Sequence, residues 1–206
     1  MKRNTIFVIL IIAIIGVTIL NFLTIGESEE SYIGRIEQER IDRNGFMLSS
    51  TSPLTDEDKR SFEGLKYYAV NPSYRLTARI ERLENRQPVF IPSTTGEQLK
   101  YIPFAKAFFE LQGQEHQVLL YQDWEEKDPN RLSLMFADET SDIETYGGGR
   151  YLDVMFRITN SVIIDFNNAY NPYCHFNDEY SCPIPPRENF IPVKISAGEK
   201  LYKSNY

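Results

Sequence analysis

The sequence contains few side chains that bind metals through nitrogen or sulfur, since it has two histidines and two cysteines in 206 residues. The paired C-x-x-C spacing of structural zinc sites is missing. The G-x-S-x-G and H-E-x-x-H motifs and a phosphate-binding loop are missing as well. These absences exclude the commonest signatures of hydrolases, zinc proteases and nucleotide-binding enzymes. We therefore predict no resident metal and no cofactor.

Basic residues are outnumbered by acidic ones. The whole chain has 22 Lys and Arg against 29 Asp and Glu, and a net charge of −7. Beyond residue 26 the balance is 20 basic to 29 acidic residues, a net charge of −9. Acidic surfaces repel phosphate backbones, and no dense basic stripe offsets this charge. Nucleic acid is therefore excluded as a predicted partner, and the acidity favours solubility.

The N-terminus holds a long apolar run, because residues 5–25 carry no charge. At about 1.5 Å per residue, a helix over this run would be about 31 Å long, enough to cross a bilayer. Lys2 and Arg3 precede the run and glutamates follow it closely, and positive charge tends to stay cytoplasmic. We predict a membrane anchor within residues 1–26 and an extracytoplasmic domain. A cleaved signal peptide is the alternative, although no A-x-A pattern marks a cut.

Residues 27–206 are enough for one domain with its own core. Apolar residues within 31–44 predict a short helix that stops at Gly45. Thr55 predicts the N-cap of a second short helix through Phe62. The predicted unit therefore begins with one or two short helices.

Beyond residue 66 the pattern changes to short strands. Residues 74–83 alternate, so that Tyr74, Leu76, Ala78 and Ile80 share one face. The sequence LQGQEH around Gly113 predicts a hairpin turn. The other predicted strands are 106–111, 117–121, 132–136, 151–156, 162–166 and 191–195. Many short strands with little helix between them predict a mainly β fold, an antiparallel barrel or sandwich that follows one transmembrane helix.

The segment 165–199 has the most unusual composition of the chain. Both cysteines, one of the two histidines, five asparagines and five of the eleven prolines fall within it. Proline fixes φ, and asparagine hydrogen-bonds its own backbone, so the segment favours turns. An ordered loop with so many polar groups is more often a functional site or a structural brace than a spacer.

Four motifs in this half of the chain carry a family resemblance. They are GGGRYLD (147–153), DFNNAYNPYC (165–174), CPIPPREN (182–189) and AGEK (197–200). In this order and spacing they resemble the bacterial and archaeal family called domain of unknown function 1684. The resemblance spans roughly residues 32–200 and implies a shared fold, but it supplies no catalytic residue.

Cys174 and Cys182 enclose a loop of seven residues. If the domain faces an oxidising compartment, these cysteines are candidates for a disulfide, worth about 2.5 kcal/mol in the chain-entropy model. Two buried thiols that act as small apolar side chains are the second interpretation. A metal site that also uses His175 is the third, although adjacent Cys and His ligands are awkward.

A cluster of polar residues in this half of the chain is the candidate binding site. Its members are Arg150, Asp165, Asn167, Asn171, Glu188, Asn189 and Glu199. Alternation places Asp165, Ile163 and Asn167 on one side of a strand, and a carboxylate there needs a partner if it is buried. Arg150 is the partner that we predict. Either this pair is purely structural, or the cluster forms a small polar pocket for a sugar, an amine or a divalent ion.

Two functions follow from these residues. The first is a membrane-tethered β-domain at the cell envelope that binds a small polar ligand or an envelope protein. The second is a hydrolase-like enzyme in which Asp165 works with Glu188 or Glu199. The second requires two carboxyl groups that converge in one cleft about 5–10 Å apart.

Overall fold

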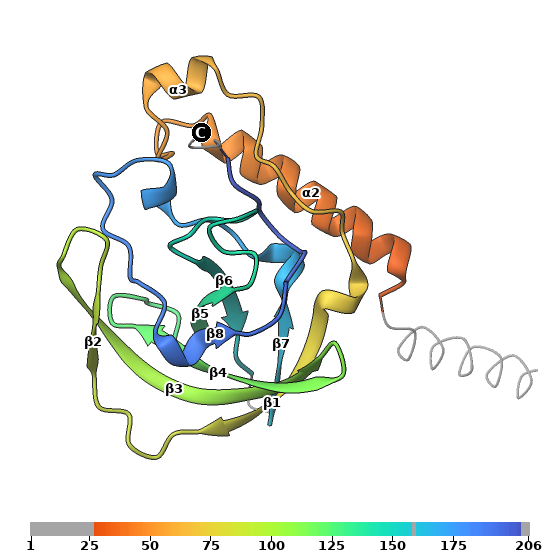
Figure 1. Ribbon diagram of the computed structural model, residues 1–206, viewed down its shortest axis with the longest axis vertical. Coiled ribbons are helices and arrows are strands. Elements are labelled where there is room, and N and C mark those ends of the chain that lie inside the picture. The colour runs from red at the N-terminus through yellow and green to blue at the C-terminus, as the bar shows by residue number, and fades with distance from the viewer. Residues whose placement is uncertain (1–26, 158–159, 203–206) are drawn as a thin grey trace, which may run out of the picture.

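A computed structural model describes residues 27–157 and 160–202. Its strands form one sheet that curls into a nearly closed barrel, with the helices on one side (Figure 1). The strands are β1 (Arg75–Arg82), β2 (Val89–Pro92), β3 (Gln98–Leu111), β4 (Gln114–Asp123), β5 (Arg131–Asp138), β6 (Arg150–Met155), β7 (Ser161–Asp165) and β8 (Phe190–Ile191). Their order is β6-β5-β4-β3-β1-β7, with β2 beside β3 and β8 beside β5. All neighbours pair antiparallel except β5 and β8, which confirms the predicted mainly β antiparallel fold as a barrel.

The two N-terminal helices are α2 (Glu29–Met47) and α3 (Asp56–Arg60). The Thr55 hydroxyl accepts a hydrogen bond of 3.1 Å from the backbone N–H of Asp58, so the predicted N-cap of α3 is confirmed. The predicted stop at Gly45 is wrong. Helix α2 continues to Met47, whose fully buried side chain packs in a small cluster with Leu54 and Leu65. Tertiary packing of Met47 thus outweighs the low helix propensity of glycine.

The barrel core confirms the alternation predicted for the first strand. Ala78 and Ile80 are buried in the core, and Tyr74 and Leu76 pack against it. The same period holds in β7, where Val162 and Ile164 are buried and Ile163 is 42% exposed. Strand β7 therefore presents its other face, which also carries Asp165, to the outside of the barrel.

The hairpin between β3 and β4 turns at Gln112 and Gly113, as predicted. Their φ angles are 55° and 75°, and two positive φ values are typical of the tightest hairpin turns. The predicted strand 191–195, in contrast, is paired only at Phe190–Ile191. Pro192 follows and has no N–H to donate, so the ladder ends there.

The barrel has a seam between its two terminal strands, β6 and β7. These strands lie side by side, yet no ladder joins them in the described part of the chain. Just beyond β7, Tyr170 forms a two-bond bridge with Tyr151 of β6, at 2.8 and 2.9 Å. Helix α2 lies against this side of the barrel, where Tyr32 reaches Asp165 at the end of β7. The seam therefore leaves space between the barrel wall and the helix.

Within residues 27–157 and 160–202, no helix is both long and apolar enough to span a membrane. The predicted anchor at 5–25 lies outside these residues.

Candidate functional site

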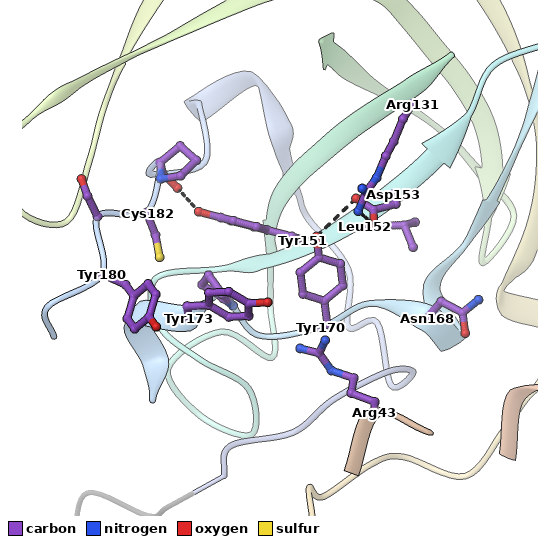
Figure 2. Close-up of a pocket in the computed structure, with 13 residues that line it drawn as sticks. Arg43, Arg131, Tyr151, Leu152, Asp153, Asn168, Tyr170, Tyr173, Tyr180 and Cys182 are labelled. Atoms are coloured by element: carbon purple, nitrogen blue, oxygen red, sulfur yellow. Dashed lines mark hydrogen bonds and ion pairs between the residues drawn. The ribbon is translucent and has the colours of Figure 1, made fainter. Parts of the chain in front are cut away.

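An open pocket of about 510 Å³ lies beside the seam. We call it the tyrosine pocket, because four of the residues that line it are tyrosines (Figure 2). The tyrosines are Tyr151, Tyr170, Tyr173 and Tyr180, and the polar residues beside them include Arg43, Arg131, Asp153 and Asn168. Its size falls within the range usual for small-molecule sites, and its lining is rich in aromatic rings.

The polar groups of the tyrosine pocket form a chain of contacts. Arg131 donates to Asp153 at 2.6 Å, and the hydroxyl of Tyr170 donates to the other oxygen of Asp153 at 3.3 Å. The guanidinium of Arg43 lies over the ring of Tyr170, 4.8 Å from its centroid. Burial, followed by the charge of Asp153, raises the pKa of Tyr170, so its hydroxyl stays protonated at neutral pH. The pocket thus has fixed hydrogen-bonding groups on one wall.

Tyr173 and Tyr180 line another part of the pocket. Their rings meet edge to face with centroids 5.3 Å apart, and Tyr173 is 37% exposed. Tyr151 is anchored through its hydroxyl, which donates to the carbonyl of Pro183. Aromatic faces held in this way can stack on a flat ligand without ordering many rotatable bonds.

The two cysteines lie next to this pocket as free, buried thiols, so the disulfide candidate is not formed in this structure. The backbone N–H of Cys174 donates to the sulfur of Cys182 at 3.1 Å, a contact that holds the loop in its turn without a covalent bond. A hydrogen bond from the Cys182 thiol lowers the pKa of Cys174 to about 7. Cys182 also lines the pocket.

His175 packs against Tyr146, with ring centroids 4.6 Å apart. Its Nε2 accepts a hydrogen bond of 3.1 Å from the backbone N–H of Tyr202. Burial lowers the pKa of His175 to about 4, so the ring is neutral near pH 7. Across the described residues, no group of three His, Cys, Asp or Glu side chains is placed to hold a metal ion.

The predicted pair of Arg150 with Asp165 is wrong. Arg150 instead pairs with Asp138 at the end of β5, at 2.7 Å, and both side chains are almost fully buried. Arg150 points into the barrel, where its Nη2 and Nη1 also donate to the carbonyls of Ile195 and Ala197. Its buried Nε has no hydrogen-bond partner among the described residues. Asp165 faces outwards at the end of β7, so the two residues lie on opposite sides of the barrel wall.

Asp165 and Asn167 lie together, as the alternation predicts, and their partner comes from α2. The hydroxyl of Tyr32 donates to both carboxylate oxygens of Asp165, at 2.8 and 2.9 Å. The side-chain amide of Asn167 donates to Asp165 at 3.1 Å and to the carbonyl of Asn71 at 2.8 Å. A tyrosine and an amide thus satisfy the carboxylate for which we predicted an arginine. Arg75 is more distant, at 3.9 Å.

Asn171 and Glu199 form a second group. The backbone N–H of Asn171 donates to Glu199 at 2.9 Å, and Arg43 donates to the other carboxylate oxygen. Glu199 is 1% exposed, and burial raises its pKa although the charge of Arg43 opposes the shift. This ion pair ties α2 to the C-terminal segment.

Glu188 and Asn189 form a third group at the other side of the barrel. Glu188 is exposed and accepts a hydrogen bond of 3.2 Å from the hydroxyl of Tyr121. The side chain of Asn189 is fully buried between β4 and β5. The seven residues of the predicted cluster therefore fall into separate groups. Asp165 and Glu199 line different cavities, and Glu188 lines neither of these two.

Sequence reasoning missed the residues that line the tyrosine pocket. Three of its tyrosines lie within the segment 165–199, whose composition had already marked it as a candidate site. Nothing in the sequence near Arg43 or Arg131 indicates a site, because these residues lie on α2 and β5, far along the chain from the tyrosines. The spacing of tyrosines around the asparagine- and proline-rich turns was the usable clue.

Comparison with known proteins points to one family. The family described as "Protein of unknown function (DUF1684)" matches residues 60–200. A solution NMR structure of an uncharacterized protein from Haloarcula marismortui is similar, with 26% identity and a TM-score of 0.66. The similarity covers 83% of this chain and 95% of that one. No curated protein matches the chain.

Proposed function

Because the chain belongs to the DUF1684 family, whose description names no activity, we propose its function from its own pocket: it binds a small ligand without transforming it. The observation that carries the proposal is the tyrosine pocket, where four tyrosine rings share one cavity with two arginines, a carboxylate and an amide. The ligand that fits this lining has a flat face for stacking and an edge of hydroxyl groups, as a sugar ring has. The carboxylates of the predicted acid/base pair are held by separate partners, which favours binding over hydrolysis.

The test is a titration of the full chain, in a neutral detergent, with a panel of monosaccharides and disaccharides followed by NMR. We expect saturable shifts in the signals of Tyr173 and Tyr180. Tyr180→Ala should weaken binding about tenfold, because it removes one stacking face. The matched control is Phe90→Ala, which removes another exposed aromatic ring at a distance from the pocket, on β2. If no sugar shifts the tyrosine signals, or if Tyr180→Ala binds as tightly as the parent, the proposal fails.

We further propose that this binding domain is tethered to the outer face of a membrane through residues 5–25. The support is the uncharged run with Lys2 and Arg3 before it and acidic residues after it. A reporter enzyme fused after Tyr206 should be active only in the exported compartment. The same reporter fused to a chain in which the basic pair has been moved to follow the run should lose that activity. Cytoplasmic activity of the first fusion would disprove the topology.

A further inference from the structure

A second, smaller cavity of about 180 Å³ lies beneath α2, next to the tyrosine pocket. Helix α2 contributes Glu39, Arg40 and Arg43 to its wall, and the turn after β7 contributes residues 167–170. Tyr67 and Glu199 complete it. The cavity holds either a few water molecules or one small organic or inorganic ion.

Two buried nitrogen atoms of Arg40 in this cavity have no hydrogen-bond partner within the described part of the chain. The residue is 8% exposed. Its Nη1 donates to the carbonyl of Tyr68 at 3.0 Å and to Glu37 at 3.3 Å. Its Nε and Nη2 are buried, and neither has a partner among the described residues. Buried donors without partners are rare and costly, so each one requires an explanation.

The two unpartnered atoms form one edge of the guanidinium. That edge presents two parallel N–H groups, the geometry that a carboxylate or a phosphate accepts with two oxygens. The ring of Tyr67 covers the face of the same guanidinium, 4.5 Å from its Cζ, and limits how far the group can turn. The Nε–H and Nη2–H groups of Arg40 are therefore held in place before an anion binds.

The charges around the cavity leave Arg40 without full compensation. Arg43 and Glu199 pair with one another and cancel. Glu39 also lines the cavity, but it pairs with Arg35 at 2.8 Å and its side chain is 45% exposed. Glu37 is the ion-pair partner of Arg40, but its side chain is 55% exposed, so water screens its charge. Burial lowers the pKa of Arg40, which shows that its positive charge is held at a cost. A negative group in the cavity would relieve that cost.

We propose that the cavity beneath α2 is a binding site for a small oxyanion, a carboxylate or phosphate group held by the Nε and Nη2 edge of Arg40. Asn168 also lines the cavity, and its side-chain amide can donate to such an anion. The proposal stands apart from the sugar proposal, because neither Arg40 nor Tyr67 lines the tyrosine pocket. Arg43, Asn168 and Tyr170 line both cavities, so the anion can be either a separate ion or the charged end of a longer ligand.

The experiment measures thermal unfolding of the full chain in a neutral detergent, with potassium phosphate and potassium acetate in separate series. Potassium chloride keeps the ionic strength constant. We expect one or both anions to raise Tm saturably, by about 3–6 °C at ten times Kd. Arg40→Gln should abolish the rise. Arg79→Gln, on β1 and outside the cavity, with a side chain that is 56% exposed and an ion pair of its own, should keep it.

A second measurement needs no variant and so does not depend on whether Arg40→Gln folds. The Nε–H signal of Arg40 in the unchanged protein should shift and saturate with the same anion. Saturation by phosphate alone assigns the site to a phosphate group, and saturation by acetate alone assigns it to a carboxylate. The proposal is overturned if neither anion exceeds chloride, or if the Arg40 signal stays fixed while surface arginines shift linearly.

Discussion

Asp138→Ala is expected to lower the free energy of unfolding by about 3–5 kcal/mol, because it strands the buried charge of Arg150. The two side chains are 0% and 1% exposed and meet at 2.7 Å. Asp138 also accepts hydrogen bonds from the backbone N–H groups of Thr140 and Ile195, at 2.7 and 3.3 Å. The substitution therefore removes three interactions at once. The loss is a large part of the roughly 5–15 kcal/mol that stabilise a typical domain.

Thermal unfolding of the full chain in detergent measures this loss. The matched control is Glu81→Ala, which breaks an ion pair with Arg79 whose side chains are both 56% exposed. An exposed pair of this kind contributes about 0–1 kcal/mol. Equal losses in the two variants would show that the Asp138 pair is not buried as described.

A double-mutant cycle separates the observed partner of Arg150 from the one that the sequence predicted. Arg150→Ala combined with Asp138→Ala should cost much less than the sum of the single losses, since neither charge is then stranded. Arg150→Ala combined with Asp165→Ala should be additive within about 0.5 kcal/mol, because Asp165 has Tyr32 and Asn167 as partners. Additive losses for Arg150 with Asp138, together with non-additive losses for Arg150 with Asp165, would show that Arg150 pairs with Asp165 instead.

Asn189→Ala is expected to cost about 3 kcal/mol, since it leaves three backbone groups unpaired, one buried and two partly buried. Strands β4 and β5 pair at Tyr121 and Ser133 and separate beyond that point. The side-chain amide of Asn189 fills the gap. Its oxygen accepts from the N–H of Leu119 at 2.6 Å, and its nitrogen donates to the carbonyls of Leu119 and Met135 at 2.9 and 2.8 Å. One side chain thus replaces a missing part of the ladder.

Urea or thermal unfolding of Asn189→Ala, compared with Asn177→Ala, tests this bridge. Asn177 makes an exposed hydrogen bond to the N–H of Glu179, so its loss should cost well under half as much. Asn189→Asp adds a sharper control, because a carboxylate keeps the shape of the side chain but cannot donate to the two carbonyls. Near-neutral results for both Asn189 variants would show that the barrel does not rely on the bridge.

The sequence by itself determined the local structure. Alternation placed Ala78 and Ile80 on one face of their strand and Ile163 and Asp165 together on one face of theirs, because side chains along a strand point to opposite faces in turn. Thr55 marked a helix start, and Gly113 marked a hairpin, because caps and tight turns depend on neighbouring residues alone. The family could also be identified, since its motifs are local strings in a fixed order.

Only the tertiary structure decided which groups meet. Tyr32 reaches Asp165 across 133 positions of the chain, and Arg150 turns to Asp138 inside the barrel. These contacts depend on strand order and on where α2 lies, and no periodicity encodes either. The tyrosine pocket forms where β6 meets the segment 168–183 and Arg43 of α2, and the cavity of Arg40 forms where α2 lies over the turn after β7. A site formed by segments distant in the chain appears only when long-range pairing fixes their positions, whereas each of its residues alone resembles an ordinary surface or loop residue.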